Sequence, residues 1–312
     1  MPVYEPVVDL DGLVRAALEG VSCLPKVAIA RSAEAHVLQA GVQACERGMA
    51  EPVLIGDRGE TERVAAEIGV DVSRFQFVEK PDDKAAVAEA VRLFREGEVS
   101  FIMKGLVSTA TLLKAVLNRE TGVPHPSRIL SLVSVCESPV DGRLLLLSDP
   151  GVNINPSLQR KVDILRNVLD VARALGMERP RVAVLAATEK VNYPAMPATL
   201  DADMLTRMAQ KGEFGDVEVQ GPLSLDLAVS PQVVASKGVG GPVAGHADIL
   251  LTPDIESGNI LYKSLSTLCG RTMASVVVGS RTPVVVPSRG DSDASKFHSI
   301  ALASLLAQRM DA

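Results

Sequence analysis

The chain has 312 residues, of which 47% are hydrophobic and 22% are charged, and this balance supports substantial folded cores in two domains of ordinary size. A net charge of -6 without a concentrated basic stripe, and an aromatic content of 3% with no Trp, argue against nucleic acid as the main partner. No apolar run approaches the roughly 18 to 20 residues of a membrane helix, and the start MPVYEPVVDLDG lacks the regions of a signal peptide. We therefore expect a globular protein of the cytoplasm with no nucleic-acid or membrane partner.

Strand-like and helix-like segments alternate through the first part of the chain. Short apolar runs predict strands, and longer segments between them predict helices. Such alternation joins parallel strands through helical crossovers and predicts an α/β domain. The predicted helices are residues 9–18, 33–47, 60–68, 82–96 and 109–118, and the predicted strands are residues 26–30, 52–55, 75–78 and 100–103.

A Pro-rich break at residues 122–126 (GVPHP) follows, and we expect a change of domain there. Two adjacent strands with a short polar connection, residues 129–135 and 143–147, predict a hairpin and therefore a mixed sheet. We expect residues 1–127 to form the first domain and residues 128–282 the second, with residues 283–312 packing back onto the first. The remaining predicted helices are residues 157–175, 199–210, 223–229, 258–269 and 293–310, and the remaining strands are residues 181–186, 217–219, 248–251, 275–278 and 284–286.

Polar residues follow the apolar runs 249–251, 275–278 and 284–286, which lack clean alternation and therefore resemble parallel strands covered on both faces. In open α/β sheets, small-molecule sites collect at the carboxyl ends of strands. Ser288 and Arg289 stand between the last strand and the last helix, where a guanidinium and free helix N–H groups favour a phosphate. The alternative is a helix cap beside a surface arginine.

Two other polar groups are placed in a similar way. Asp254, Gly258 and Asn259 are predicted at a strand-to-helix junction, and Lys104 with Gly105 follows the strand 100–103. The alternatives are turn formers, caps and an exposed lysine. The turn-rich segment 149–156 (DPGVNINP) either lines a cleft or caps the following helix.

Several common motifs are missing. The Gly-rich loop at residues 238–241 fails the dinucleotide spacing, and the sequence has neither a Walker A motif nor a GxSxG nucleophile elbow. The four Cys and four His residues show no metal-ligand spacing, so we expect no metal site, and a disulfide framework is equally disfavoured.

With these residues in place, the chain resembles the phosphate acetyltransferase and phosphate butyryltransferase family over nearly its whole length, most closely the butyryl branch. The resemblance rests on a series of short motifs in a fixed order. They are residues 103–106 (MKGL), 108–109 (ST), 112–118 (LLKAVLN), 148–149 (SD), 153–156 (NINP), 221–226 (GPLSLD), 247–251 (ADILL), 258–263 (GNILYK), Pro283 and residues 288–289 (SR).

The resemblance implies reversible acyl transfer between coenzyme A and inorganic phosphate, with butyryl or another short chain favoured over acetyl. It implies two α/β domains like those of isocitrate and isopropylmalate dehydrogenases, with the active site in the cleft between them. Coenzyme A is then a substrate and no cofactor is tightly bound. Family members are typically cytoplasmic and assemble as homodimers or larger oligomers.

The same resemblance assigns roles to residues. Ser288 would hydrogen-bond the thiol or the developing oxyanion, and Arg289 would neutralise phosphate. Acetyl-type members carry an aspartate, the proposed thiol base, where this chain has Ser295, so Asp291 is the first candidate base here and Asp293 the second. Leu132 stands where butyryl-type members commonly have a histidine. The expected substrate-binding and coenzyme A-binding residues are Lys104, Gly105, Asp254, Gly258, Asn259, Lys263 and Asp293.

Two alternatives remain. A metal-dependent decarboxylating dehydrogenase of similar architecture would need an aspartate cluster for Mg²⁺ and a nicotinamide site. A coenzyme A-binding relative without catalytic activity would keep the fold and lack the base.

Overall fold

The computed structural model describes residues 4–19, 23–288 and 290–310, which divide into two compact units. The Ser288 unit consists of Leu10–Ile129 and Thr272–Ala312, and the Asp254 unit consists of Met1–Asp9 and Leu130–Arg271. These units differ from the expected domains at residues 1–9, 128–129 and 272–282, and the domain boundaries stay a prediction. Within the described ranges, no helix has both the length and the apolar character needed to cross a membrane.

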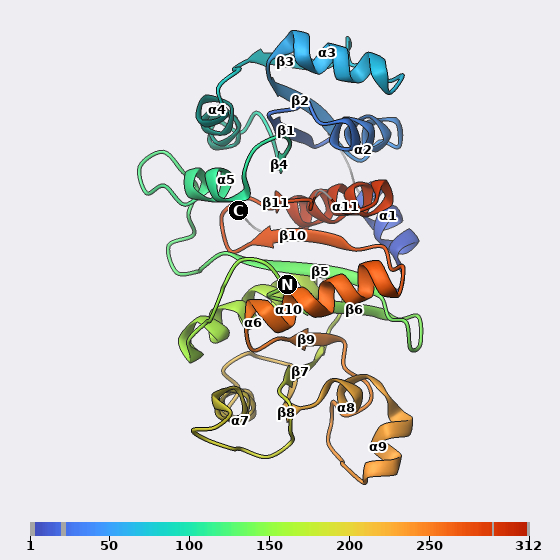
Figure 1. Ribbon diagram of the computed structural model, residues 1–312, viewed down its shortest axis with the longest axis vertical. Coiled ribbons are helices and arrows are strands. Elements are labelled where there is room, and N and C mark those ends of the chain that lie inside the picture. The colour runs from blue at the N-terminus through green and yellow to red at the C-terminus, as the bar shows by residue number, and fades with distance from the viewer. Residues whose placement is uncertain (1–3, 20–22, 289, 311–312) are drawn as a thin grey trace. The chain divides into compact units, whose positions relative to one another are not determined.

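The described residues of the Ser288 unit form six strands in the order β3-β2-β1-β4-β11-β10 (Figure 1). Neighbouring strands from β3 to β11 run parallel, as the predicted crossovers require. The expectation that the run 275–278 is also a parallel strand is wrong, because β10 pairs antiparallel with β11. The short connection between these two strands leaves no room for a crossover of a dozen residues. The strands are β1 (Lys26–Ala30), β2 (Glu51–Gly56), β3 (Gln76–Glu79), β4 (Phe101–Lys104), β10 (Ala274–Val278) and β11 (Val284–Val285).

Helices cover both faces of these strands, with α4 on one side and α2 and α11 on the other (Figure 1). Four helices of the unit begin at an Asp or Ser whose side chain accepts a hydrogen bond from a backbone amide of the first turn, and these caps account for where the helices start. Helix α11 packs against α1, α2 and β10 and is buried almost all round. The helices are α1 (Leu10–Leu18), α2 (Ala35–Glu46), α3 (Arg58–Glu67), α4 (Asp83–Arg95), α5 (Thr109–Val116) and α11 (Asp293–Arg309).

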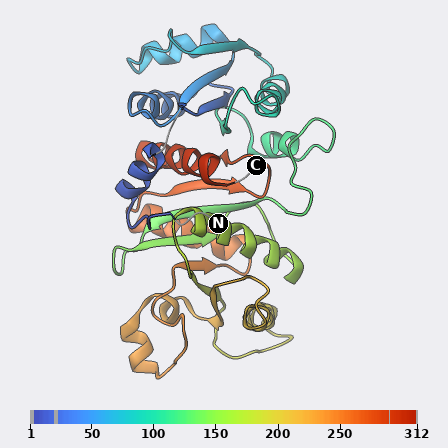
Figure 2. The ribbon, with the colours of Figure 1, turned by 180° about the vertical axis from the view of Figure 1, so that it is seen from behind.

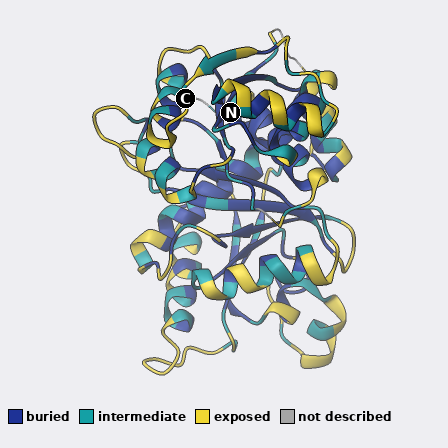
Figure 3. Cartoon of the chain, turned by 45° about the horizontal axis from the view of Figure 1, so that its top comes forward, coloured by how far each residue is buried: buried dark blue, intermediate teal, exposed yellow. Residues whose placement is uncertain are grey.

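In the Asp254 unit, residues 4–9 and 130–271 are described and form five strands in the order β5-β6-β9-β7-β8. The predicted hairpin is confirmed, because β5 and β6 pair antiparallel, whereas β6, β9, β7 and β8 run parallel and complete a mixed sheet. Figure 3 shows the strands buried and the outward faces of the helices exposed. The strands are β5 (Ser131–Glu137), β6 (Leu144–Ser148), β7 (Arg181–Leu185), β8 (Glu218–Leu223) and β9 (Ile249–Leu251).

Helices α6 and α10 cover opposite faces of β6, with α10 in front in Figure 1 and α6 in front in Figure 2. Helix α9 was not predicted, because Ser230 ends α8 and caps α9 at once and a seven-residue helix leaves little periodic signal. A short π-helical turn, Ser264–Leu268, continues α10. The helices are α6 (Leu158–Ala174), α7 (Pro197–Gln210), α8 (Leu225–Val229), α9 (Pro231–Lys237) and α10 (Ile255–Lys263).

Candidate active site

A cavity of about 180 Å³ in the Ser288 unit brings together three residues that the sequence analysis selected. Lys104 is the last residue of β4, Gly105 follows it, and Ser288 comes three residues after β11. Because β4 and β11 are parallel neighbours, their carboxyl ends meet at one edge. The cavity walls are Glu34, Val37, Lys104, Gly105, Leu106, Val107, Pro287, Ser288 and Lys296.

Two hydrogen bonds join Ser288 and Asp291. The Ser288 amide donates to Asp291 Oδ2 at 2.7 Å, and the Asp291 amide donates to the Ser288 carbonyl at 3.1 Å. Ser292 then caps α11 by accepting from the Ser295 amide at 3.1 Å. Arg289 lies outside the described residues. Ser288 is therefore bonded to Asp291, two residues before α11 begins at Asp293.

Gly105 is required by a close approach of two backbones. A Cβ atom at this position would lie 2.1 Å from the Arg31 carbonyl oxygen, and the Gly105 amide donates to the Ala30 carbonyl at 2.9 Å. The neighbouring Lys104 is half-buried, and its Nζ donates to the carbonyls of Gly105 and Val107 at 3.2 and 3.3 Å. Both residues thus have structural contacts, and their binding roles stay predictions.

Lys296 also lines this cavity, and sequence reasoning missed it. Its side chain is on α11, the residue is only 2% exposed, and its Nζ donates to the Asp291 carbonyl at 2.6 Å. A lysine is rarely buried to this degree. Because α11 is buried almost all round, its sequence has no polar stripe against which an inward lysine would stand out.

The predicted acids and Ser295 have different environments. Asp293 is exposed and its Oδ1 lies 2.7 Å from His36 Nδ1, outside the residues that line the cavity. Ser295 is buried, and its Oγ accepts hydrogen bonds from the Met273 amide and from Ser292 Oγ, each at 3.0 Å. Ser295 thus ties α11 to the segment before β10. The catalytic roles of Asp291 and Asp293 stay predictions.

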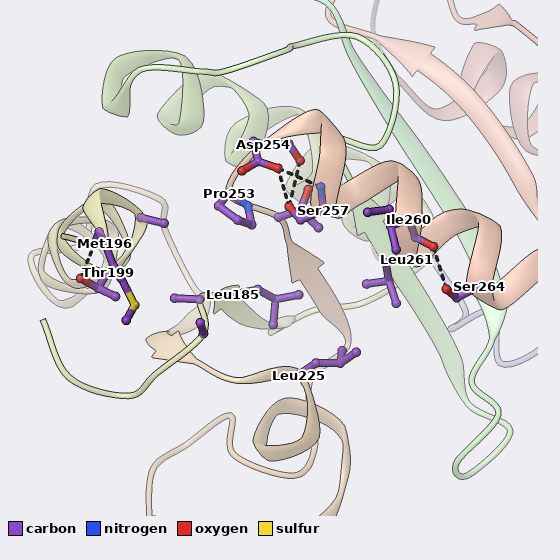
Figure 4. Close-up of a pocket in the computed structure, with 14 residues that line it drawn as sticks. Leu185, Met196, Thr199, Leu225, Pro253, Asp254, Ser257, Ile260, Leu261 and Ser264 are labelled. Carbon is purple, nitrogen blue, oxygen red and sulfur yellow. Dashed lines mark hydrogen bonds between the residues drawn. The ribbon is translucent and has the colours of Figure 1, made fainter. Parts of the chain in front are cut away.

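A larger cavity of about 660 Å³ lies within the Asp254 unit and is mostly apolar (Figure 4). It opens at the carboxyl ends of β7 and β9, which are neighbouring parallel strands. The chain continues from β7 to α7 and from β9 to α10. Such switch points form crevices in open α/β sheets. Figure 4 shows Leu185, Leu225 and Leu261 around the cavity, with Asp254 at its edge.

Asp254 is the N-cap of α10, because its Oδ1 accepts from the Ser257 amide at 2.8 Å and from Ser257 Oγ at 2.7 Å. The helix therefore begins at Ile255, and the expectation that Gly258 and Asn259 lie at the strand-to-helix junction is wrong. Both lie within α10, where Asn259 Nδ2 donates to the Pro150 carbonyl at 3.3 Å.

Gly258 allows α10 to pack closely against Thr252 and against the loop that follows β6. A Cβ atom there would lie 2.8 Å from Thr252 Oγ1 and 2.9 Å from the Asp149 carbonyl oxygen. At the other end of the helix, Lys263 Nζ lies 4.9 Å from the centre of the Tyr262 ring. Of the four residues predicted to bind substrate in this unit, Asp254 alone is among those lining the cavity. Their roles stay predictions.

The buried carboxylate of Asp149 organises the turn-rich loop that follows it. Oδ1 accepts from the amides of Leu132, Gly151 and Val152 at 3.2, 3.0 and 3.0 Å. Oδ2 accepts from the amide and the side-chain Nδ2 of Asn153 at 3.0 and 2.6 Å. Burial raises the pKa of Asp149, and these hydrogen bonds oppose the rise. The side chain of Leu132 packs against Gly151, where a Cβ atom would meet it at 2.8 Å.

Comparison with known proteins gives a consistent result. Residues 82–304 match the family described as "Phosphate acetyl/butaryl transferase". The chain is 44% identical to the phosphate butyryltransferase of Clostridium acetobutylicum, over 91% of this chain and 94% of the relative. It is 40% identical to the phosphate acetyltransferase of Thermotoga maritima, over 90% and 95%.

Solved structures agree with these sequence relatives. A branched-chain phosphotransacylase from Enterococcus faecalis is similar with a TM-score of 0.80 and 34% identity, over 92% of this chain and 100% of that one. A phosphotransacetylase from Streptococcus pyogenes has a TM-score of 0.77 at 20% identity, over 96% and 98%, and supports the fold alone. The family resemblance predicted from the sequence is confirmed, and the chain belongs to the phosphate acetyl/butyryl transferase family.

Proposed function

We propose that this protein transfers a short acyl group reversibly between coenzyme A and inorganic phosphate, with butyryl or a similar chain favoured over acetyl. The observation that carries the proposal is the 44% identity to a phosphate butyryltransferase over 91% of the chain. The matched family and its relatives indicate a phosphate acyltransferase, which agrees with the enzyme class predicted from the sequence.

The dehydrogenase alternative is not favoured by these relatives. It would need several acidic ligands around a divalent ion. Within the described ranges, no three His, Cys, Asp or Glu side chains gather in a way that could hold a metal ion. The relative without activity would bind coenzyme A and fail to turn it over, so it is separated by the assay below.

The Ser288 cavity is our proposed phosphate site. Its support is that Ser288, Lys104 and Lys296 line it and that Lys296 lies in the first turn of α11. Helix N-termini and cations both favour an anion. Arg289 follows Ser288 in the chain and would add a planar guanidinium, which binds phosphate through two parallel hydrogen bonds.

In the proposed reaction, a phosphate oxygen forms a bond to the acyl carbon while the bond from that carbon to sulfur breaks. The phosphate loses its proton, and the departing thiolate gains one. Ser288 would donate to the developing oxyanion or to the sulfur, and Arg289 would neutralise the phosphate charge. In the reverse direction the thiol must lose its proton, because the thiolate is the better nucleophile. No acyl-enzyme is needed, and alignment of the two substrates supplies much of the rate.

Asp291 is our first candidate for the group that carries this proton, and Asp293 is the second. One oxygen of Asp291 accepts the Ser288 amide, so the carboxylate is coupled directly to the loop that bears the proposed hydroxyl. Replacing each acid in turn with Asn and measuring kcat separates them. A larger fall for Asp293→Asn would reverse their order.

We propose the Asp254 cavity as a site for the coenzyme A side of the reaction. Its volume and apolar lining suit an aliphatic arm better than an inorganic anion. Ala187→Phe would fill part of the cavity and should raise the KM for acyl-CoA while leaving the KM for phosphate unchanged. Ala66→Phe, on the exposed face of α3, is the matched control. An unchanged acyl-CoA KM in Ala187→Phe would remove this cavity from the proposal.

Three finer expectations from the resemblance remain part of the proposal. They are an active site in an interdomain cleft, assembly as a homodimer or larger oligomer, and a cytoplasmic location. A crystal structure with coenzyme A and phosphate tests the first, light scattering in solution tests the second, and cell fractionation tests the third. A monomer at the protein concentration used in the activity assay would contradict the expected assembly.

Release of coenzyme A from a panel of acyl-CoAs, measured with and without inorganic phosphate, tests the function. We expect release that depends on phosphate and is fastest with a four-carbon or similar acyl group. Tight binding of acyl-CoA without release would favour the relative that lacks activity. Release of coenzyme A at the same rate with and without phosphate would indicate a hydrolase and contradict the proposal.

A further inference from the structure

Lys296 places a buried positive charge in the wall of the Ser288 cavity. The residue is 2% exposed, and the described residues give its Nζ one hydrogen bond, at 2.6 Å to the Asp291 carbonyl. An ammonium group has three N–H donors, so two remain for another acceptor. Burying an ammonium costs several kcal/mol unless an anion or a full set of acceptors offsets it.

Among the described residues that line the cavity, two lysines stand against one glutamate. Lys104, at the end of β4, contributes a second amino group. Glu34 also lines the cavity, but its Oε2 caps α2 by accepting from the Val37 amide at 2.5 Å. The Asp291 carboxylate accepts from the Ser288 amide. Each of these carboxylates accepts a hydrogen bond from a backbone amide.

We propose that Lys296 is a binding residue for the oxyanion substrate, donating to an oxygen of inorganic phosphate in the Ser288 cavity. The inference rests on the proposed function and deepens it, because it assigns the phosphate site a buried cation in addition to the expected Arg289. One N–H of Lys296 holds the Asp291 carbonyl and so positions the Ser288 loop. The other two N–H groups would donate to the anion, and Lys104, which also lines the cavity, would add a second positive charge.

Lys296→Gln tests this role, because an amide keeps a donor for the Asp291 carbonyl and removes the charge. We expect the dissociation constant of inorganic phosphate, measured by calorimetry, to rise at least about tenfold. The KM for phosphate should rise similarly, while the KM for acyl-CoA stays within about twofold. Lys84→Gln, an exposed lysine on α4, is the matched control and should change none of these values. A purely structural lysine would instead lower stability and leave the phosphate affinity unchanged.

The outcomes separate the inference from the function on which it rests. A wild-type enzyme that lacks phosphate-dependent release overturns the proposed function, whereas wild-type activity with unchanged phosphate binding in Lys296→Gln overturns the role of Lys296 alone. If the variant does not fold, a crystal structure of the wild-type protein with inorganic phosphate decides. An anion within hydrogen-bonding distance of Lys296 Nζ supports the inference, and an anion bound elsewhere contradicts it.

Discussion

At the scale of single residues, the buried carboxylate of Asp149 accepts hydrogen bonds from Leu132, from the amides of Gly151 and Val152, and from Asn153. Asp149→Asn would turn an NH₂ group toward N–H donors and leave some of them unsatisfied in the interior. We expect the free energy of unfolding to fall by about 1 to 3 kcal/mol, measured by urea denaturation. Asp216→Asn, at a side chain that is 75% exposed, is the control. Equal stabilities of the two variants would show that the hydrogen bonds of Asp149 contribute little.

Cys136 predicts a dependence of stability on alkaline pH. Burial in β5 raises the pKa of this thiol to about 12, from an ordinary 9.0. The native state therefore holds the proton more tightly than the unfolded state. The stability that this group contributes is present below pH 9.0 and is lost as pH rises toward 12. The difference in unfolding free energy between wild type and Cys136→Ala should decline above pH 9.0. A difference that stays constant to pH 11 would contradict the burial of this thiol.

Sequence reasoning reached part of the candidate site at this scale. Lys104, Gly105 and Ser288 were selected as polar residues after strands, and parallel pairing of those strands brings them to one cavity. Lys296 was missed because its orientation depends on how α11 packs against several elements at once, which no periodic pattern in the helix reports. The contacts of Gly258 and Asn259 with the Asp149 loop were out of reach for the same reason.

At the scale of elements, the packing of α10 depends on Gly258. Ala is the better helix former by about 1 kcal/mol, yet its Cβ would lie 2.8 to 3.0 Å from Thr252, Asp149 and Pro150. Overpacking of this kind typically costs about 1 to 3 kcal/mol, so we expect Gly258→Ala to lower the melting temperature. Gly59→Ala in α3, where the nearest atom would be 3.5 Å away, should be neutral or stabilising. A gain in both variants would show that α10 can shift freely.

Most helices and strands were predicted from the sequence. Predicted strands and helices recur with ends moved by a few residues, because caps such as Asp57 and Asp254 set the first turn. The apolar run of β10 did not itself predict the direction of the strand, because a buried apolar run is the same for either direction of pairing. The short connection to β11 carried the decisive signal.

At the scale of the whole molecule, we propose that the two units bind different substrates. Phosphate would bind in the Ser288 cavity, whose lining includes Lys104 and Lys296, and the coenzyme A side would bind in the apolar cavity of the Asp254 unit. Alternation of strands and helices predicted the α/β class, which composition alone could not. The ordered motifs predicted the activity, and the family match supports that prediction.

Phosphorus NMR of one reaction mixture tests the proposed acyl transfer between coenzyme A and phosphate most directly. The wild-type protein would be incubated with butyryl-CoA and inorganic phosphate, and acyl phosphate would be followed together with free thiol. We expect butyryl phosphate to appear in the same amount as released coenzyme A, and we expect added coenzyme A to reverse the reaction. Release of coenzyme A without any acyl phosphate signal, or no reaction at all, would contradict the proposal.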